Sequence, residues 1–512
     1  MGDGGYGIAT DAVGNSYITG EFQSPTITFG TTTLNCSGNK DIFVTKFDPS
    51  GNVLWAKGIG GSSNEVSWSI FESGGDVYLT GYYESTSLTI GTTTLSNAGL
   101  ADIFLTKFDA NGNVIWVKNA GATGNDQGWA VATDPAGNVL LIGSFASSVL
   151  TLGSYTLTNT GNKDIYVAKF DSNGNVLWAK SAIGTGDDFG GSIISDINGN
   201  VYIGGSFVSP TLSFGTTTLT SAGSDDVYLA KYDSNGNELW AKSSGGVNGD
   251  YGGNIVLDAS GNICLAGYFS SLSFTCGTTT LNRLGPSIDG FVAKYNPNGN
   301  LAWAKNVAGT SGVFCYGILT DTGNNVYVSG DFTGTLNTFS PTVLSSSGNK
   351  DIFVGKFDGN GNPIWAINAG GNSIESGYNL SRDAANNVYL TGMYVSSPAS
   401  FGTNTLSCSG GSDFFIAMLG STTSGINENY FSDLTAVFPN PFFDQTTLVF
   451  ESAMNNATLT LYNSIGQKVK EFQKLNGEEM VLQRDNLPSG MYFIRIVEGA
   501  KLIATKKLIV TD

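Results

Sequence analysis

Histidine is absent from this chain of 512 residues, and its absence excludes whole classes of catalytic site. Neither a Ser-His-Asp nor a Cys-His arrangement can form, and neither can zinc or iron sites with imidazole ligands. Cysteine is scarce and has no CxxC spacing: Cys36, Cys264, Cys276, Cys315 and Cys408. An odd number cannot all pair internally, and small buried or loop thiols explain these residues better than a metal or redox site does.

Positive charge is also scarce. The chain has 24 Lys and Arg against 42 Asp and Glu, a net charge of −18 and a pI near 4.3. This balance argues against nucleic acid as a partner and against docking on anionic lipid, because both need a basic surface. It leaves cations and neutral glycans as ligands. Since 40% of the residues are hydrophobic, the chain has ample material for a core.

Long apolar runs are missing too. None approaches the ~18 residues of a membrane-spanning helix, so we expect no membrane insertion. The start, Met1-Gly-Asp-Gly-Gly5, has neither the basic nor the apolar region of a secretory signal peptide.

What the chain does contain is a repeat of about 62 residues. A tryptophan closes one recurring segment, at Trp55, Trp116, Trp178, Trp240, Trp303 and Trp365. A second segment ends in glycine in seven copies, at Gly20, Gly81, Gly143, Gly205, Gly267, Gly330 and Gly392. Each copy contains two β-rich hairpins joined by Asn-Gly or Gly-Asn turns, and no helical period is visible.

Four strands in each of seven repeats predict an all-β fold, a seven-bladed β-propeller over residues 1–420. A solenoid is disfavoured because the end repeats lack atypical polar caps.

We predict no disulfide, because Cys36 and Cys408 lie in equivalent connections of neighbouring blades, beyond the ~7 Å limit for a bridge.

One strand is missing from this count, since six tryptophan-bearing strands serve seven repeats. The period places the seventh about six residues before Met1. We therefore expect the native protein to supply that strand, preceded by a signal peptide that this chain lacks.

The repeats resemble the bacterial β-propeller repeat family, as in Asp164-Ile-Tyr-Val-Ala-Lys-Phe170. That resemblance implies a fold and says little about activity.

After residue 420 the repeat stops. Residues 421–434 form a polar linker, and residues 435–512 contain short alternating segments such as Ala457 to Tyr462. They predict a small Ig-like β-sandwich.

This tail resembles the type A C-terminal sorting domain of the type IX secretion system of Bacteroidota. The matching motifs are Phe438-Pro-Asn-Pro-Phe442, Leu487-Pro-Ser-Gly-Met-Tyr-Phe493 and Lys506-Lys-Leu-Ile-Val510. The resemblance implies that sorting depends on Phe438, Pro439, Asn440, Pro441, Leu487, Gly490, Tyr492, Lys506 and Lys507. It also implies the secretion translocon and its sortase-like processing enzyme as partners, and an extracellular or outer-membrane-surface location.

Two sets of repeated residues are candidate site residues. Acidic residues near the start of the innermost strands would surround one mouth of the channel: Asp3, Glu65, Asp126, Asp188, Asp250 and Glu375, with Val313 in the remaining copy. Such a ring could hold a cation, with Ca²⁺ as the candidate cofactor. The alternative, favoured because the acids recur, is that each accepts hydrogen bonds from loop N–H groups.

Three residues further on lies an aromatic set that could stack a sugar: Tyr6, Trp68, Trp129, Tyr316 and Tyr378. Glycine replaces it at Gly191 and Gly253. The favoured alternative is packing between blades, because strand alternation would place the aromatics on the same face as the apolar residues two positions later.

No reactive cluster stands out from these repeats. We therefore favour a non-catalytic secreted or cell-surface binding protein, an adhesin or a glycan-binding module that recognises glycans or surface polymers. Two alternatives stay open: an extracellular polysaccharide lyase or hydrolase, and a structural surface component. An active site should break the repeat, and the clearest breaks are the aromatic-to-glycine changes and Val313.

Overall fold

The computed structural model describes residues 2–419, 434–463, 467–498 and 501–511. These residues form 46 strands and no helix, so none of them forms a helix able to cross a membrane. The chain folds as two compact units, residues 1–421 and 422–512. The all-β fold predicted from the sequence is confirmed.

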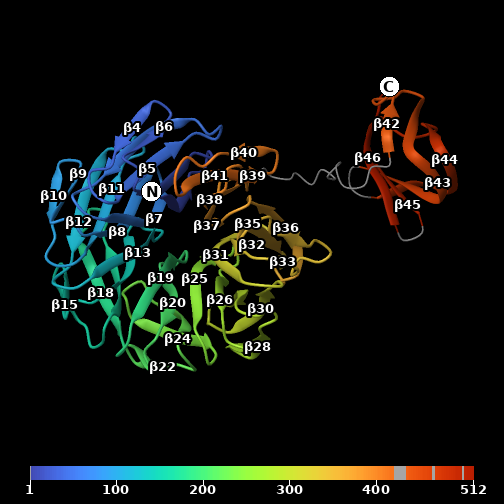
Figure 1. Cartoon of the computed structure of the whole chain (residues 1–512). Coiled ribbons are helices and arrows are strands. Elements are labelled where there is room, and N and C mark those ends of the chain that lie inside the picture. The colour runs from blue at the N-terminus through green and yellow to red at the C-terminus, as the bar shows by residue number, and fades with distance from the viewer. Residues whose placement is uncertain (1, 420–433, 464–466, 499–500, 512) are drawn as a thin grey trace. The chain divides into compact units, whose positions relative to one another are not determined.

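In the first unit, seven antiparallel sheets surround a common centre, with the first strand of each sheet innermost (Figure 1). We number the sheets 1 to 7 along the chain. The first strands are β1 (Asp3–Thr10), β7 (Glu65–Ser73), β13 (Asp126–Thr133), β19 (Asp188–Ser195), β25 (Asp250–Leu257), β31 (Val313–Thr320) and β37 (Glu375–Arg382). The second strands are β2 (Ser16–Phe22), β8 (Asp76–Tyr83), β14 (Val139–Phe145), β20 (Val201–Phe207), β26 (Ile263–Phe269), β32 (Val326–Phe332) and β38 (Val388–Tyr394).

The third and fourth strands complete each sheet outward. The third strands are β5 (Asp41–Phe47), β11 (Asp102–Phe108), β17 (Asp164–Phe170), β23 (Asp226–Tyr232), β29 (Asp289–Tyr295), β35 (Asp351–Phe357) and β41 (Asp413–Leu419). The fourth strands are β6 (Val53–Ile59), β12 (Val114–Ala120), β18 (Val176–Ile183), β24 (Glu238–Gly245), β30 (Leu301–Val307) and β36 (Pro363–Ala369). In its described residues sheet 7 has three strands, ordered β37-β38-β41.

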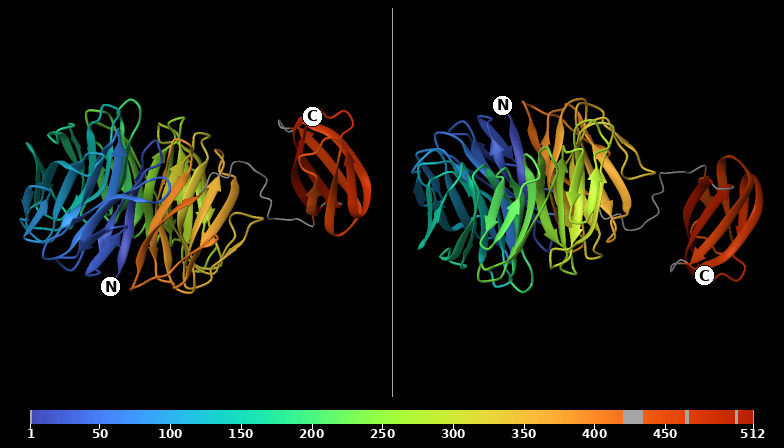
Figure 2. Two further views of the ribbon diagram at one scale, coloured as in Figure 1. Left: turned by 90° about the horizontal axis from the view of Figure 1, so that it is seen from above. Right: turned by 90° about the horizontal axis from the view of Figure 1, so that it is seen from below.

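A small hairpin connects the second strand of each sheet to the third. These hairpins are β3 (Thr26–Phe29) with β4 (Thr32–Asn35), β9 (Ser87–Ile90) with β10 (Thr93–Ser96), β15 (Val149–Leu152) with β16 (Tyr155–Thr158), β21 (Thr211–Phe214) with β22 (Thr217–Thr220), β27 (Ser273–Cys276) with β28 (Thr279–Asn282), β33 (Thr335–Leu336) with β34 (Leu344–Ser345), and β39 (Ala399–Phe401) with β40 (Asn404–Leu406). Figure 2 shows the same unit from two further directions.

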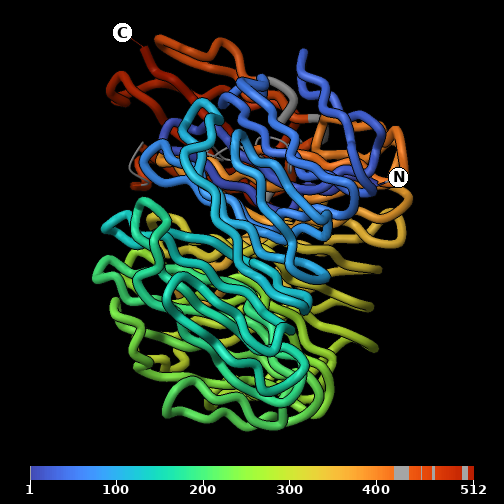
Figure 3. The backbone as a smooth tube through the Cα atoms, turned by 90° about the vertical axis from the view of Figure 1, so that its left-hand side faces the viewer, coloured from blue at the N-terminus to red at the C-terminus, as the bar shows by residue number. Residues whose placement is uncertain are grey.

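The sheets close into a ring. A parallel bridge links the start of a third strand to the start of the next first strand, as in Lys40 with Asn64. The same bridge joins Gly2 to Ser412, so sheet 7 meets sheet 1 as other neighbours meet. In Figure 3 the blue and orange segments of these two sheets lie side by side. This closure is what a propeller requires.

The hairpin turns follow from their sequence. In the turn after β17, Asp171 accepts hydrogen bonds from the backbone N–H groups of Asn173 and Asn175, at 2.9 and 2.8 Å. Gly174 has φ of +77°, a conformation that glycine adopts without steric strain. The carboxylate and the glycine together fix the hairpin.

The third strands of sheets 1 to 5 are buried throughout. Their lysines are buried as well, and they are held by ion pairs and rings rather than exposed to solvent. Lys169 Nζ lies 2.7 Å from Asp134 in the hairpin between the first two strands, and Lys294 makes the equivalent pair with Asp258 at 2.7 Å.

The second unit contains β42 (Leu434–Phe438), β43 (Gln445–Asn463), β44 (Lys468–Gln483), β45 (Gly490–Glu498) and β46 (Lys501–Val510). These strands of the small β-sandwich form one continuous antiparallel sheet, because the long β43 pairs with β42, β44 and β45. Leu459, Leu461 and Ile496 lie in its fully buried core.

Candidate binding site

A β-bulge interrupts every first strand of the propeller. In β1 the pairing with β2 passes from Gly5 directly to Gly7, and it skips Trp68 in β7 and Trp129 in β13 in the same way. The skipped residue in the other sheets is Gly191, Tyr316 or Tyr378, and in β25 it is Gly253 with Asn254. The aromatic set predicted from the sequence is therefore the set of bulged residues.

The bulge removes the basis of the alternation argument, but packing between blades stays an alternative, because the rings contact one another between neighbouring sheets. An unpaired residue shifts the strand by one position, so the side chain no longer shares a face with the apolar residue two positions later. Ile8 and Ile70 are buried, whereas Tyr6, Trp68 and Trp129 are only half-buried. A bulge thus re-aims each aromatic side chain.

The five bulged aromatic side chains contact one another across neighbouring sheets, and we call them the aromatic belt. Ring centroids are 4.8 Å apart for Tyr6 and Trp68, and 5.3 Å for the nearly parallel rings of Trp68 and Trp129. Tyr378 lies 5.6 Å from Tyr6 and 5.7 Å from Tyr316. The belt runs over sheets 6, 7, 1, 2 and 3 without a break.

Other aromatic residues border the belt on the glycine side of the ring. Phe189, two residues before Gly191, lies edge-on to Trp129 at 6.5 Å. Tyr268 lies 6.2 Å from Tyr316 and stacks on Tyr251 at 5.1 Å. The two glycines therefore do not leave the channel without aromatic side chains on that side.

The six repeated acids are buried at the start of the innermost strands. Asp126 accepts hydrogen bonds from the N–H groups of Ala122, Ala146 and Ser147, at 2.9, 3.0 and 3.0 Å. Equivalent N–H donors reach Asp3, Glu65, Asp188, Asp250 and Glu375. In sheet 6 the buried Val313 takes this place. These contacts favour the loop-acceptor alternative for the acids.

Burial has electrostatic consequences for this set. Burial raises the pKa of Asp250 to about 6 and also raises the pKa of Asp188 and Glu65, although hydrogen bonds from neighbouring serines oppose the shift. In the described part of the chain, no three acidic or cysteine side chains lie close enough together to hold a metal ion.

Two further acids, Glu21 and Asp331, lie beside the belt and were not predicted. Glu21 is buried and pairs with Lys40 Nζ at 2.7 Å. Asp331 is fully buried and lies 3.2 Å from Lys350 Nζ. It accepts hydrogen bonds from the Ser376 hydroxyl at 2.7 Å and from the Tyr316 hydroxyl at 3.3 Å.

The tyrosines beside these acids are perturbed. Burial raises the pKa of Tyr6 and Tyr316, and the charges of Glu21 and Asp331 raise the two values further. Burial also raises the pKa of Tyr378 to about 12. All three hydroxyls stay protonated at neutral pH and can donate hydrogen bonds.

A comparison of the seven copies of the repeat could have indicated these two acids. The residue after each second-strand glycine is Glu21, Tyr82, Ser144, Ser206, Tyr268, Asp331 or Met393. A structural role would repeat in every sheet, whereas this position changes chemistry from copy to copy.

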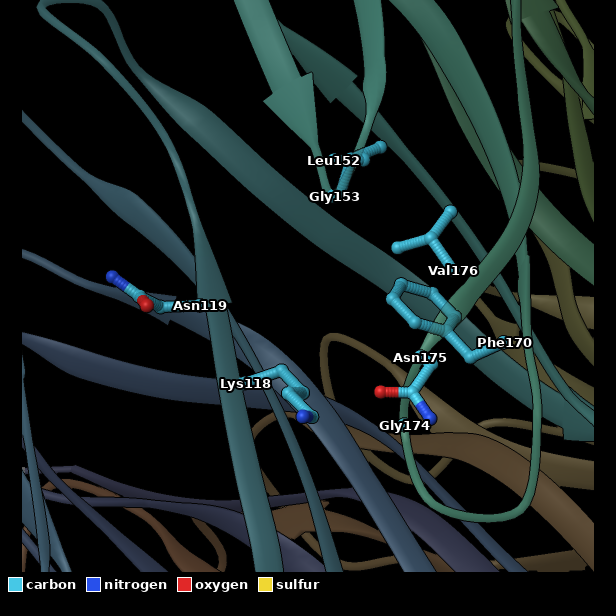
Figure 4. Close-up of a pocket in the computed structure, with 8 residues that line it drawn as sticks. All are labelled: Lys118, Asn119, Leu152, Gly153, Phe170, Gly174, Asn175 and Val176. Carbon is cyan, nitrogen blue, oxygen red and sulfur yellow. The ribbon is translucent and has the colours of Figure 1, made fainter.

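A groove with a volume of about 380 Å³ lies between β12 and the β17–β18 hairpin of the next sheet (Figure 4). Lys118 and Asn119 line one side, and Phe170, Gly174 and Asn175 line the other. It contains no unusual polar cluster, so the belt is the stronger candidate.

In the second unit the predicted sorting residues converge. Asn440 donates to the Lys507 carbonyl at 2.9 Å and accepts from the Ile509 N–H at 2.8 Å, which joins the first motif to the last strand. Tyr492 is buried, and its hydroxyl donates to the Pro488 carbonyl at 2.8 Å. Phe438, Pro439, Pro441 and Lys507 are exposed, Leu487 and Lys506 are half-buried, and Gly490 has φ of +155°.

Arg484 connects residues that lie in or directly after the three motifs. Its guanidinium donates to the carbonyls of Leu487, Phe443 and Thr511 at 3.1, 3.3 and 2.8 Å. One residue therefore links the entrance, the penultimate turn and the C-terminal strand.

These contacts agree with a comparison to known families. Residues 436–511 match the secretion system C-terminal sorting domain family. The tail is a sorting domain, and it implies that the type IX secretion system handles this chain and exports it to the cell surface or the extracellular space.

Relatives of the propeller are distant. An uncharacterized WD repeat-containing protein of Acanthamoeba polyphaga mimivirus is 26% identical over 360 residues, which cover 56% of this chain and 26% of that protein. Regulatory protein FlaEY of Caulobacter vibrioides is 24% identical over 220 residues, covering 41% and 23%. The alignments span about a quarter of the length of each relative.

Solved structures are similar at low identity. PorZ, a surface component of the type IX secretion system of Porphyromonas gingivalis, has a TM-score of 0.29 at 11% identity, covering 98% of this chain and 73% of that one. The WD40 domain of Neurospora crassa Pan2 also has a TM-score of 0.29 at 11% identity, covering 63% and 85%.

Proposed function

We propose that the exported propeller is a binding protein whose aromatic belt takes a sugar ring of a neutral extracellular glycan. The main observation in support is that each of five consecutive sheets has a half-buried aromatic side chain at its bulge, and that the rings of neighbouring sheets are in contact. Aromatic faces are suited to the apolar C–H faces of sugars.

Polar groups beside the belt support this proposal. Tyr6 and Tyr316 supply hydroxyl donors, and Glu21 and Asp331 supply acceptors for sugar hydroxyls. A ligand site combines an apolar surface with a few placed polar groups. The net charge of −18 disfavours acidic polysaccharides, because like charges repel.

A glycan panel tests the proposal. We expect neutral oligosaccharides, such as β-glucans or mannans, to bind and to change the tryptophan fluorescence, and we expect polygalacturonate not to bind. Trp68→Leu combined with Trp129→Leu should weaken binding at least tenfold, which is a loss of about 1.4 kcal/mol.

The matched control is Trp116→Leu, a half-buried tryptophan on the fourth strand of sheet 2. It should leave affinity unchanged. Equal loss in both variants, or no binding to any glycan, would contradict the proposal. Turnover of a polysaccharide would favour the enzymatic alternative.

For the tail, we propose that residues 435–512 carry all of the sorting information, and that the sortase-like enzyme processes the chain near residues 421–434. The convergence of the motifs on one strand supports this division. A signal-peptide-bearing fluorescent protein fused to residues 425–512 should be secreted by a Bacteroidota host. Retention of the fusion in the periplasm, under conditions that export the full chain, would contradict it.

A further inference from the structure

In two sheets of the propeller, the polar tip of the belt residue meets an acceptor on the second strand of its own sheet. The Trp129 indole N–H donates to the Ser144 hydroxyl in sheet 3, at 3.0 Å. The Tyr316 hydroxyl donates to Asp331 in sheet 6, at 3.3 Å. Each acceptor is the residue that directly follows the glycine of the second strand. This position is therefore the place where the repeat supplies an acceptor to the belt.

Sheet 2 has no such acceptor for its belt residue, Trp68. Tyr82 stands in the place of Ser144 and Asp331, and its ring centroid lies 6.5 Å from that of Trp68. The Trp68 indole nitrogen is buried and has no hydrogen-bond partner among the described residues. A buried indole N–H normally has a partner, because a buried donor without one lowers stability. We call this place, formed by Trp68 and Tyr82, the donor corner.

Two carboxylates determine which kind of acceptor suits the donor corner. Burial, followed by the charges of Glu84 and Glu21, raises the pKa of Tyr82 to about 12, so both carboxylates lie near its hydroxyl. A carboxylate, sulfate or phosphate of a ligand would be repelled by them. A protonated amine has no lone pair with which to accept from Trp68. The acceptor that fits this corner is therefore neutral.

The direction of the indole N–H selects the reach of that acceptor. An indole N–H lies in the plane of its ring, whereas a sugar stacked on the ring lies above that plane. A hydroxyl oxygen is bonded directly to the sugar ring, but the carbonyl oxygen of an acetamido group projects farther from it. The acetamido group is also planar and ends in a methyl group, which suits a place bounded by the rings of Trp68 and Tyr82.

We propose that the glycan bound by the belt contains N-acetylhexosamine, and that its acetamido carbonyl accepts a hydrogen bond from the Trp68 indole N–H. This inference rests on the proposed function, because the belt must bind a sugar before an acetamido group can reach the donor corner. Trp68 then determines which sugar is preferred, while the other rings of the belt supply stacking that any neutral sugar can use.

Two trisaccharides test this inference on the full chain. Triacetylchitotriose and cellotriose have the same linkage, and they differ only in carrying an acetamido group or a hydroxyl at one position of each ring. Isothermal titration calorimetry should show that triacetylchitotriose binds at least tenfold more tightly, because a buried donor is left unpaired when the acceptor is missing. The deacetylated trimer, which carries protonated amines, should bind no more tightly than cellotriose.

A conservative variant separates the N–H from the ring. Trp68→Phe keeps an aromatic ring for stacking and removes the donor. It should reduce the preference for triacetylchitotriose to less than twofold and leave the affinity for cellotriose within twofold of the wild type. Trp129→Phe is the matched control, because the N–H that it removes already has an acceptor in Ser144. This control should keep the tenfold preference.

Tyr82→Ser is a second variant, and it leaves all five residues of the belt in place. It supplies the acceptor that sheet 3 has in Ser144, so the Trp68 N–H is satisfied within the protein. This variant should lose the preference for triacetylchitotriose and keep the affinity for cellotriose.

Three results would overturn the inference and leave the proposed glycan binding intact. They are equal binding of the two trisaccharides by the wild type, a tenfold preference that survives Trp68→Phe, and binding of neutral glycans that lack the acetamido group alone. Loss of cellotriose binding in both Trp68→Phe and Tyr82→Ser would also overturn it, because the two residues would then act in folding or stacking. Absence of binding to any neutral glycan would overturn the proposed function together with this inference.

Discussion

Replacing Asp102 by asparagine should stabilise the propeller at neutral pH. Asp102 begins β11 and is fully buried. One carboxylate oxygen accepts a hydrogen bond from the Ala98 N–H at 3.0 Å, and the other has no hydrogen-bond partner among the described residues. Burial raises the pKa of Asp102 from 3.8 to about 6, against the opposing effect of the Ala98 N–H, and the nearby Asp126 raises it further.

The sign and size follow from linkage. A carboxyl whose pKa is higher in the folded state holds its proton more tightly there, so stability rises as the pH falls through 6 toward 3.8. At pH 7.5 the ionised group lowers the free energy of unfolding by about 3 kcal/mol, and at pH 4 by about 0.5 kcal/mol. Asparagine removes this term but buries an amide N–H without an acceptor, a loss of about 1 kcal/mol.

We therefore expect Asp102→Asn to gain about 2 kcal/mol at pH 7.5 and to become slightly less stable than the wild type at pH 4. Urea unfolding followed by tryptophan fluorescence measures this, because all eight tryptophans precede residue 421 and report on the propeller alone.

The control is Asp109→Asn in an exposed turn. Hydrogen bonds from the side chain and backbone of Asn113 lower the pKa of Asp109, so its contribution is present above its ordinary pKa and is lost as the pH falls. This variant should lose stability at pH 7.5. A destabilised Asp102→Asn protein at pH 7.5, or a difference that does not change with pH, would refute the reasoning.

Three further outcomes are expected. Lys169→Ala should lower the free energy of unfolding by about 3 to 5 kcal/mol, because it leaves Asp134 buried without its ion pair; urea titration measures the loss, and a change below 1 kcal/mol would contradict the role of the pair. Thiol titration should find five free thiols in the denatured, unreduced protein but only Cys36 and Cys408 in the native one, since the other three are buried; three or fewer in the denatured protein would indicate a disulfide. Arg484→Ala, expressed behind a signal peptide, should leave the propeller's unfolding curve unchanged and reduce the exported protein on immunoblots of the medium; normal export would remove Arg484 from the sorting function.

The repeat was sufficient to predict the propeller because the conformation of each hairpin turn is determined by residues within that turn. Asp171 and Gly174 fix a hairpin through local hydrogen bonds and a positive φ, and a local rule can be read from a short segment. The count of six tryptophans against seven glycine segments likewise corresponds to the three strands described in sheet 7.

The candidate site was less predictable because it depends on where alternation fails. Nothing in the sequence around Tyr6 or Trp68 marks a bulge, and a strict period of two does not hold across it. Glu21 and Asp331 could not be predicted from the repeat, because the equivalent position is not acidic in the other copies. The burial of the ion pair between Lys169 and Asp134 could not be predicted from the sequence, because the two residues come from different hairpins.

The bridge between Gly2 and Ser412 makes the two ends of the ring spatial neighbours. Sheets meet through the same backbone contact at this junction as at Lys40 and Asn64, so the ring has no privileged starting point in its hydrogen bonding. A circularly permuted gene that begins at the loop before Asn125 and joins residue 419 to residue 2, through a linker long enough to span the length of β41 (roughly 23 Å), should therefore encode the same ring. The junctions between sheets are accordingly places where foreign segments can be inserted with little loss of stability.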